Sequence, residues 1–185
     1  MRFLLYNIRY GTGGKRHRLP WSGYLRKTGK NLDDIIRFAG ACDPDIIGLV
    51  EVDAGSYRSG NSNQARLIAE TLGHYHTYKS KYAEDGMLSR LPMLNKQGNA
   101  FLTRDTITNA TFHFFNKGVK RLVIELELEN LTVFLVHLSL RFRVRHTQLN
   151  DLYSLVKATH KPCLVAGDFN ALWGEHEITL FLAAT

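Results

Sequence analysis

The residues best suited to chemistry in this sequence are a carboxylate and an amide two positions apart, Asp168 and Asn170. They follow a short apolar run, Cys163 to Ala166, which is typical of a buried strand and breaks at Gly167. In an extended chain the side chains of residues i and i+2 point the same way, so both polar groups can face one pocket. The same residue types also favour an Asx turn, because their side chains hydrogen-bond the local backbone. The motif by itself leaves a site and a structural turn open.

Three other apolar segments end in the same way, with a polar side chain where the strand would finish. These side chains are Asn7, Glu51 and His137. Because a sheet aligns the ends of its strands, we expect residues at such exits to gather along a shared edge. Carboxylates and amides without cysteine suit a hard cation such as Mg²⁺, which takes few protein ligands and keeps water or substrate phosphate in its other positions. Zinc is disfavoured because Cys and His lack the spacing of a tetrahedral site.

Hydrophobic periodicity predicts the elements that position these side chains. Apolar residues at helical spacing predict helices at residues 31–39, 64–72, 149–156 and within 173–185. In the first of these, Asn31 is a suitable N-cap and Gly40 a suitable stop. Apolar or alternating segments predict strands at residues 2–9, 46–50, 74–81, 99–103, 107–115, 121–128, 131–138 and 163–166. Such strand-dense sequence indicates sheets with antiparallel neighbours.

The length and composition are those of an ordinary globular protein. A chain of 185 residues with 44% hydrophobic residues suits one domain with a sizeable core, and no segment resembles a linker. The N-terminus lacks the apolar core of a secretory signal, and no apolar run approaches the ~20 residues that span a bilayer. We therefore expect a cytoplasmic protein without a transmembrane segment. Cys42 and Cys163 flank apolar segments and are predicted to be reduced core residues.

The charge of the chain favours polyanionic partners, since the formal net charge is +7 and the isoelectric point is near 9.5. Residues 10–31 carry many basic side chains and no acid, together with Trp21 and Tyr24, which could stack on a base. A second basic cluster comprises Arg141, Arg143, Arg145 and His146. Either segment can be a solvated surface. An unrelieved block of positive charge repels itself, which favours contact with phosphate.

Five motifs follow one another along nearly the whole chain: Tyr6-Asn7-Ile8-Arg9, Asp45 to Val52, Gly98 to Thr103, His137-Leu138-Ser139 and Gly167-Asp168-Phe169-Asn170. In this order they resemble the endonuclease/exonuclease/phosphatase superfamily. Its members include pancreatic deoxyribonuclease, abasic-site endonucleases, neutral sphingomyelinases and inositol polyphosphate phosphatases. The Gly-Asp-Phe-Asn element, together with an upstream strand that ends in Glu, is the most specific part of this resemblance.

The resemblance implies an α/β fold, a four-layer α/β sandwich of two mostly antiparallel sheets flanked by helices. It also implies a metal-dependent phosphoesterase that hydrolyses phosphodiester or phosphomonoester bonds with Mg²⁺, or with Mn²⁺ as the alternative. In such a site a metal and fixed donors stabilise the charge that builds on the phosphoryl oxygens. The residues that the resemblance assigns are Glu51 and Asn7 at the metal, Asp168, Asn170 and His137 in catalysis, and Arg121 and Asn99 at the substrate.

One element of the superfamily is missing from this chain. Its members normally finish with Ser-Asp-His on a late strand, and this sequence contains no Ser-Asp-His. We therefore expect residues 1–185 to form a single domain of this superfamily that is truncated at its C-terminus. The loss of an acid or base from such a set lowers the rate by orders of magnitude.

Several functions are compatible with these residues. The basic surface and Trp21 favour nucleic acid as the phosphoester substrate, and an anionic lipid headgroup is the alternative, as for a phospholipid phosphodiesterase of the sphingomyelinase type. A hypothesis from another class is a non-catalytic polyanion-binding domain that uses the two basic segments. That domain would bind polyanions without metal, and high salt would weaken the binding.

Overall fold

The computed structural model of the chain describes residues 1–12, 28–81, 94–171 and 176–184. The chain folds into two compact units, Met1–Thr106 and Ile107–Thr185, and each unit contains one four-stranded sheet. In each sheet two neighbouring pairs of strands are antiparallel and one pair is parallel. The prediction of an α/β fold with two mostly antiparallel sheets flanked by helices is confirmed, and the single domain stays a prediction.

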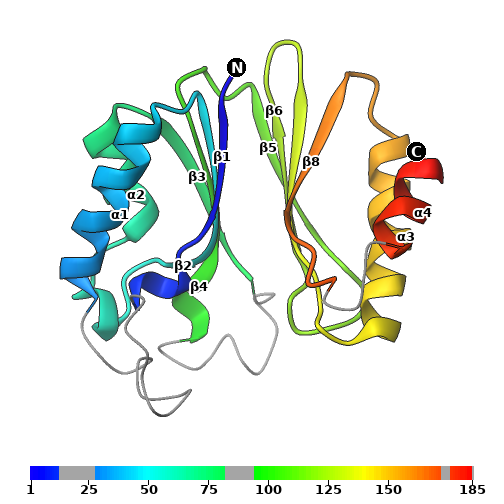
Figure 1. Cartoon of the computed structure of the whole chain (residues 1–185), viewed down its shortest axis with the longest axis horizontal. Coiled ribbons are helices and arrows are strands. Elements are labelled where there is room, and N and C mark those ends of the chain that lie inside the picture. Colours follow the sequence, from blue (N-terminus) through cyan, green and yellow to red (C-terminus); the bar gives the residue numbers. More distant parts are fainter. Residues whose placement is uncertain (13–27, 82–93, 172–175, 185) are drawn as a thin grey trace. The chain divides into compact units, whose positions relative to one another are not determined.

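The sheet of the first unit has the strand order β1-β2-β4-β3, and α1 and α2 cover one of its faces (Figure 1). The neighbours β1 and β2 are parallel, and α1 connects them. Ile35 of α1 and Ile68 of α2 pack on Ile47, Leu49 and Leu102 of the sheet. The elements are β1 (Phe3–Asn7), η1 (Arg9–Gly11), α1 (Gly29–Cys42), β2 (Ile46–Asp53), η2 (Tyr57–Ser59), α2 (Gln64–Leu72), β3 (Tyr75–Ser80), η4 (Leu94–Lys96) and β4 (Gln97–Thr103).

The helices of the first unit test the capping predictions. The helix α2 matches the predicted residues, because the side chain of Asn63 accepts the backbone N–H of Arg66 at its start and Gly73 is left-handed at its end. Both ends predicted for α1 are wrong, since the helix begins at Gly29 with Thr28 as its N-cap and continues past Gly40 to Cys42. Asn31 lies in the first turn instead, where its side-chain amide donates a hydrogen bond of 3.0 Å to the carbonyl of Gly11.

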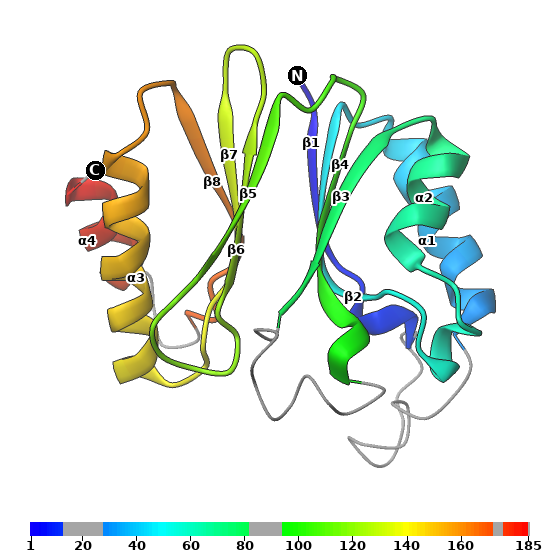
Figure 2. The ribbon, with the colours of Figure 1, turned by 180° about the vertical axis from the view of Figure 1, so that it is seen from behind.

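The sheet of the second unit has the strand order β5-β6-β7-β8, and α3 and α4 lie along one of its faces (Figure 2). The neighbours β7 and β8 are parallel, and α3 connects them. Leu149 and Leu152 of α3 and Phe181 of α4 pack on Phe134 and Val136 of β7. The elements are β5 (Asn109–Phe114), β6 (Leu122–Glu127), β7 (Thr132–His137), α3 (Phe142–Lys157), β8 (Cys163–Asp168) and α4 (His176–Ala184).

Two predicted strand ends lie further along the chain than expected. The strand β2 continues past Glu51 to Asp53, and β8 continues through Gly167 to Asp168. Gly167 continues β8 because its φ of 152° is open to glycine and a Cβ there would lie 1.9 Å from the carbonyl oxygen of Val136. Glu51 and Asp168 therefore lie within the strands rather than in the loops that follow them.

The cysteines are both free, as predicted, but neither lies in the buried core. Cys42 is half-buried, whereas Cys163 is exposed. The prediction of a core position is wrong for Cys163 because it is the first residue of β8, which is the edge strand of its sheet. Within the part of the chain that the structure describes, no helix is long and apolar enough to cross a membrane.

Candidate functional site

The candidate residues of the first unit meet where β2 loses its regular pairing with β4. Leu49 pairs with Ala100 and Val52 pairs with Gly98, so that two residues of β2, Val50 and Glu51, lie opposite Asn99. This is a β-bulge, and Glu51 adopts the left-handed conformation in it, with φ 57°. A left-handed residue other than Gly, Asn or Asp costs roughly 1–2 kcal/mol. Such strain is found at functional sites more often than elsewhere, which makes Glu51 a candidate on structural grounds.

One amide side chain, Asn99, bonds to the bulge, and a second, Asn7, lies on the neighbouring strand. The side-chain oxygen of Asn99 accepts the backbone N–H of Glu51 at 3.3 Å, and so replaces a hydrogen bond that the irregular pairing leaves out. Asn7 pairs with Val50 in the parallel register of β1 and β2, and its side-chain oxygen accepts the backbone N–H of Arg9 at 3.0 Å. A cavity of about 340 Å³ has Asn7 and Arg9 among its lining residues. The structure therefore brings Asn7, Glu51 and Asn99 together at one end of the first sheet.

A buried ion pair lies directly after the bulge and was missed at the sequence level. Asp53 and Arg58 are both 0% exposed, and their side chains meet at 2.9 Å. The Asp53 carboxylate also accepts the backbone N–H and the hydroxyl of Ser56, at 2.7 and 2.5 Å. The backbone N–H of Asp53 donates a hydrogen bond to the side-chain oxygen of Gln64 at 2.9 Å. This network holds the end of β2 against the start of α2 and so fixes the chain that leaves Glu51.

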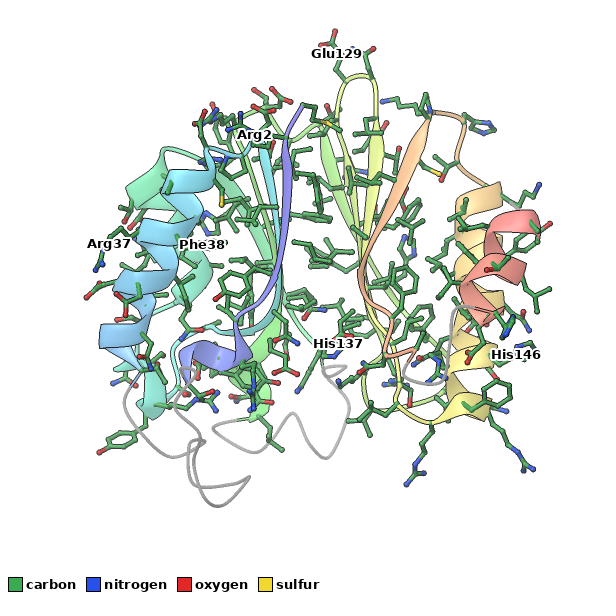
Figure 3. All side chains as sticks on the ribbon, in the orientation of Figure 1. Arg2, Arg37, Phe38, Glu129, His137 and His146 are labelled. Carbon is green, nitrogen blue, oxygen red and sulfur yellow. The ribbon has the colours of Figure 1, made fainter. Side chains whose placement is uncertain are left out.

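The candidate residues of the second unit lie at the ends of its two parallel strands. His137 and Asp168 are register partners, and His137 Nε2 lies 3.5 Å from Asp168 Oδ2. Phe134 and Val136 pack against α3, so the alternation of β7 places His137 on the opposite face of the sheet. Figure 3 labels His137 near the carboxyl ends of these strands, on the side away from α3. Within the second unit, His137 and Asp168 therefore lie side by side at the ends of neighbouring strands.

The loop after β8 contains the turn that the sequence left open as an alternative to a site. The backbone N–H of Asn170 donates to Asp168 Oδ1 at 3.2 Å, which is an Asx turn. Asn170 is left-handed, with φ 52°, and its side-chain amide donates to the carbonyl of Leu138 at 2.7 Å. The Asx turn and a site are therefore compatible, because the turn itself fixes Asn170 beside the end of β7, next to His137 and Asp168.

The basic residue that contacts His137 is Lys120 rather than its neighbour Arg121. The Lys120 ammonium donates a hydrogen bond to His137 Nε2. Arg121 precedes β6, in which Val123 faces α3, so alternation places the Arg121 side chain on the helix-covered face. The substrate contact assigned to Arg121 stays a prediction. Lys120 could have been found only by weighing both adjacent basic residues at the start of this strand.

The structure tests only one of the two basic segments predicted to contact phosphate. Residues 13–27, with Trp21, Tyr24 and most of the first segment's charge, lie outside the described residues. In the second cluster Arg145 is 1% exposed and forms a bidentate ion pair with Glu177, at 2.6 and 2.9 Å. Arg145 is therefore a structural residue, and Arg141, Arg143 and His146 carry the exposed charge of the cluster.

The donor set of the first unit suits a hard divalent cation. Among the described residues there is no group of three or more His, Cys, Asp or Glu side chains that could hold a metal ion. Glu51 supplies one carboxylate, and Asn7 and Asn99 supply one amide oxygen each, which also accepts a backbone N–H. One carboxylate with amide oxygens fits Mg²⁺, which binds through one or two carboxylates and retains several waters.

The fold is shared with solved structures of low sequence identity. A protein of the endonuclease/exonuclease/phosphatase family from Leptotrichia buccalis superposes with a TM-score of 0.68 and 17% identity, over 100% of this chain and 74% of that chain. ANGEL2, described as a 2',3'-cyclic phosphatase, gives a TM-score of 0.62 and 20% identity, over 94% and 53%. TDP2 from D. rerio in complex with a single-strand DNA product gives 0.62 and 13%, over 98% and 64%. The chain spans about half to three quarters of the lengths of these proteins.

The sequence comparison identifies the family. The model of the Endonuclease/Exonuclease/phosphatase family matches residues 4–185, and the chain belongs to this family. No match is found among curated proteins. The resemblance inferred from the five motifs is confirmed by this match, which covers all of them.

Proposed function

We propose that this protein is a metal-dependent phosphoesterase that hydrolyses phosphodiester bonds, with nucleic acid as its substrate. The observation that carries the proposal is the register pairing of His137 and Asp168 on one face of the second sheet, with Asn170 fixed beside them by the Asx turn. Membership of the family supports hydrolysis of a phosphoester. The similarity to TDP2, which was solved with a DNA product, supports nucleic acid.

The residues of the second unit would act on the water and the phosphoryl group. Asp168 would orient or deprotonate the attacking water through a carboxylate that the backbone N–H of Asn170 already holds by one oxygen. Asn170 uses one amide hydrogen on the Leu138 carbonyl, and its second amide hydrogen would donate to a phosphoryl oxygen. His137 would contact phosphate or hold this pocket in shape.

The residues of the first unit would hold the metal and contact the substrate. Glu51 and Asn7 are the proposed metal residues, and Asn99 would contact the substrate beside them. A bound Mg²⁺, or Mn²⁺ as the alternative, supplies positive charge next to the phosphoryl oxygens. The bulge gives Glu51 a direction that regular pairing would not, since regular alternation would turn it to the same face as Ile47 and Leu49, toward the helices.

The proposal is tested by a hydrolysis assay with a matched pair of variants. The full chain is incubated with plasmid DNA, bis-p-nitrophenyl phosphate and sphingomyelin, in Mg²⁺ or in EDTA. Asp168→Asn is expected to lower metal-dependent kcat about 10²–10⁴-fold with an unchanged Tm, because it removes a base and keeps the side-chain shape. Asp151→Asn, on α3 in the same unit, is the control and should leave the rate unchanged. Absence of metal-dependent turnover on every phosphoester contradicts the proposal.

The non-catalytic alternative makes the opposite prediction for the same proteins. A polyanion-binding domain would bind DNA equally well in Mg²⁺ and EDTA, and Asp168→Asn would bind as the wild type does. Its binding would fall steeply as salt rises, because basic side chains release counterions from the phosphates. Cleavage of sphingomyelin without cleavage of DNA would favour a phospholipid phosphodiesterase instead.

A further inference from the structure

Exposed apolar and basic side chains gather at one end of the second unit, where α3 begins. Leu140 and Phe142 are 56% and 59% exposed, and the intervening Arg141 and the following Arg143 are exposed as well. Val119, in the loop between β5 and β6, is 59% exposed. We refer to these five residues as the α3 rim.

The α3 rim is one surface because Gln148 joins its two segments. The Gln148 side-chain amide donates to the carbonyls of Lys117 and Lys120, at 3.0 and 2.7 Å, and its oxygen accepts the N–H of Ser139 at 2.8 Å. Gln148 is 0% exposed, so these hydrogen bonds are shielded from water. Figures 1 and 2 both show the loop between β5 and β6 beside the start of α3. The loop that carries Val119 is therefore held next to Leu140.

The arginines of the rim differ in what they contact. Within the described residues neither the Arg141 nor the Arg143 guanidinium takes part in an ion pair. The Arg145 guanidinium, in contrast, binds Glu177 and also donates to the carbonyls of Ser139 and Leu140, both at 3.0 Å. Arg145 thus fixes the backbone under the rim, while the side chains of Arg141 and Arg143 are exposed to solvent.

An apolar cavity adjoins the rim. It lies between α3 and α4, has a volume of about 450 Å³, and Phe142 is one of its lining residues. Most of its lining is hydrophobic, from Leu149, Tyr153, Leu180 and Phe181. A cavity of this size and lining suits an acyl chain better than a polar ligand.

We propose that the α3 rim docks this protein on bilayers that contain anionic phospholipids. Arg141 and Arg143 would lie at the headgroup phosphates, and Leu140, Phe142 and Val119 would enter the boundary with the acyl chains. Leucine and valine neither stack on bases nor donate hydrogen bonds, so a nucleic acid would gain little from two of the three apolar residues. A bilayer gains from all five. This docking is separate from the proposed hydrolysis and would place the protein at a membrane surface whatever its substrate.

The test is flotation of the full chain with vesicles of phosphatidylcholine alone or with one fifth phosphatidylserine. We expect binding to the anionic vesicles, little binding to the neutral ones, and a loss of roughly 30-fold in partition for Arg141→Gln/Arg143→Gln. The charge-matched control is Arg37→Gln/Arg66→Gln, whose arginines lie exposed on the helices of the first unit and which should change partition less than twofold. Circular dichroism checks that each variant is folded.

A second pair of variants tests the apolar part of the rim. Phe142→Ser in the rim should lower partition into the anionic vesicles about tenfold. The burial of an aromatic side chain in the acyl region is favourable, and serine loses most of that gain. The control is Phe38→Ser, because Phe38 is 50% exposed on α1 and follows Arg37, as the labels in Figure 3 show. Equal losses in rim and control variants, or no preference for anionic vesicles, would overturn the proposal. It would also fail if Arg141→Gln/Arg143→Gln weakened binding to an oligonucleotide and left vesicle binding unchanged.

Discussion

The two units fix their candidate residues by different means. In the first unit the strand itself is irregular, since Glu51 sits in a bulge with φ 57° and Asn99 replaces a missing backbone partner. In the second unit the strands are regular up to their ends, and His137 and Asp168 face the same way because parallel pairing puts them in register. The left-handed residue there is Asn170, a residue type that tolerates this conformation.

The difference shows where each arrangement gets its stability. A strained Glu51 persists only if the surrounding structure determines its conformation, and the buried Asp53–Arg58 network directly after it does so. The second unit needs no such network beside Asp168, because backbone pairing and an Asx turn are sufficient. Variants that remove a buried ion pair should therefore lower the stability of the first unit more than that of the second.

The largest expected effect is the loss of the buried arginine in the first unit. Arg58→Met leaves the Asp53 carboxylate buried without its cation and removes the contact of the guanidinium with the Tyr10 ring, 4.6 Å away. We expect a loss of about 3–5 kcal/mol in the free energy of unfolding, measured by urea denaturation. Arg145→Met in the second unit should cost less, because its partner Glu177 is 14% exposed and can be hydrated.

Arg66→Met is the control for these two variants. Arg66 pairs with Glu70 on the surface of α2, where such a pair is worth no more than about 0.5 kcal/mol. If Arg58→Met and Arg66→Met lowered the free energy of unfolding equally, the Asp53–Arg58 network would not be the support that the comparison requires.

The second expected effect is a loss of stability at alkaline pH that originates in the first unit. Burial, and secondarily the charge of Asp53, raises the pKa of Tyr78 above the ordinary tyrosine value of 10.0. Below pH 10 the hydroxyl is protonated in both states, and above it the unfolded chain loses the proton first. Stability should then fall by up to about 1.4 kcal/mol per pH unit.

Tyr78→Phe is expected to remove this part of the pH dependence. The variant also loses the hydrogen bond of 2.9 Å from the Tyr78 hydroxyl to the Lys96 carbonyl, so it should be about 1 kcal/mol less stable at neutral pH. The measurement is urea denaturation at pH 8 and at pH 11. A wild-type slope that persists in Tyr78→Phe would assign the alkaline sensitivity to other groups.

Local signals in the sequence were sufficient to predict the helices and strands and the Gly167-Asp168-Phe169-Asn170 motif of the second unit. The helix α2 was predicted to the residue from the helical spacing of its apolar side chains, and the polar residues at the ends of β7 and β8 were predicted from the apolar runs before them. The family followed from the order of these exits. Apolar runs and caps depend on neighbours within a few residues, which is what a sequence shows directly.

Features that depend on distant partners were not predicted. The bulge at Glu51 requires the side chain of Asn99, 48 residues away, and nothing in the apolar run before Glu51 indicates it. Arg145 was part of a basic cluster, yet it is buried against Glu177, 32 residues away. Arg58 was missed although its partner Asp53 is only five residues away, because nothing in the local sequence shows that both side chains are buried. A charged residue type therefore predicts an exposed side chain only where the fold supplies no buried partner of opposite charge.

The smallest expected effect separates the two left-handed residues, and it does so by sign. Glu51→Gly should raise the free energy of unfolding by about 1 kcal/mol, because glycine adopts φ 57° without strain. Asn170→Gly should lower it by about 1 kcal/mol, because asparagine is little strained there and the variant loses the hydrogen bond to the Leu138 carbonyl. Paired urea denaturation curves measure both changes. Both variants should lower the proposed hydrolysis, so that Glu51→Gly would be more stable and less active than the wild type. If Glu51→Gly were destabilised as much as Asn170→Gly, the bulge would not store strain, and the contrast between an irregular first unit and a regular second unit would not extend to their energetics.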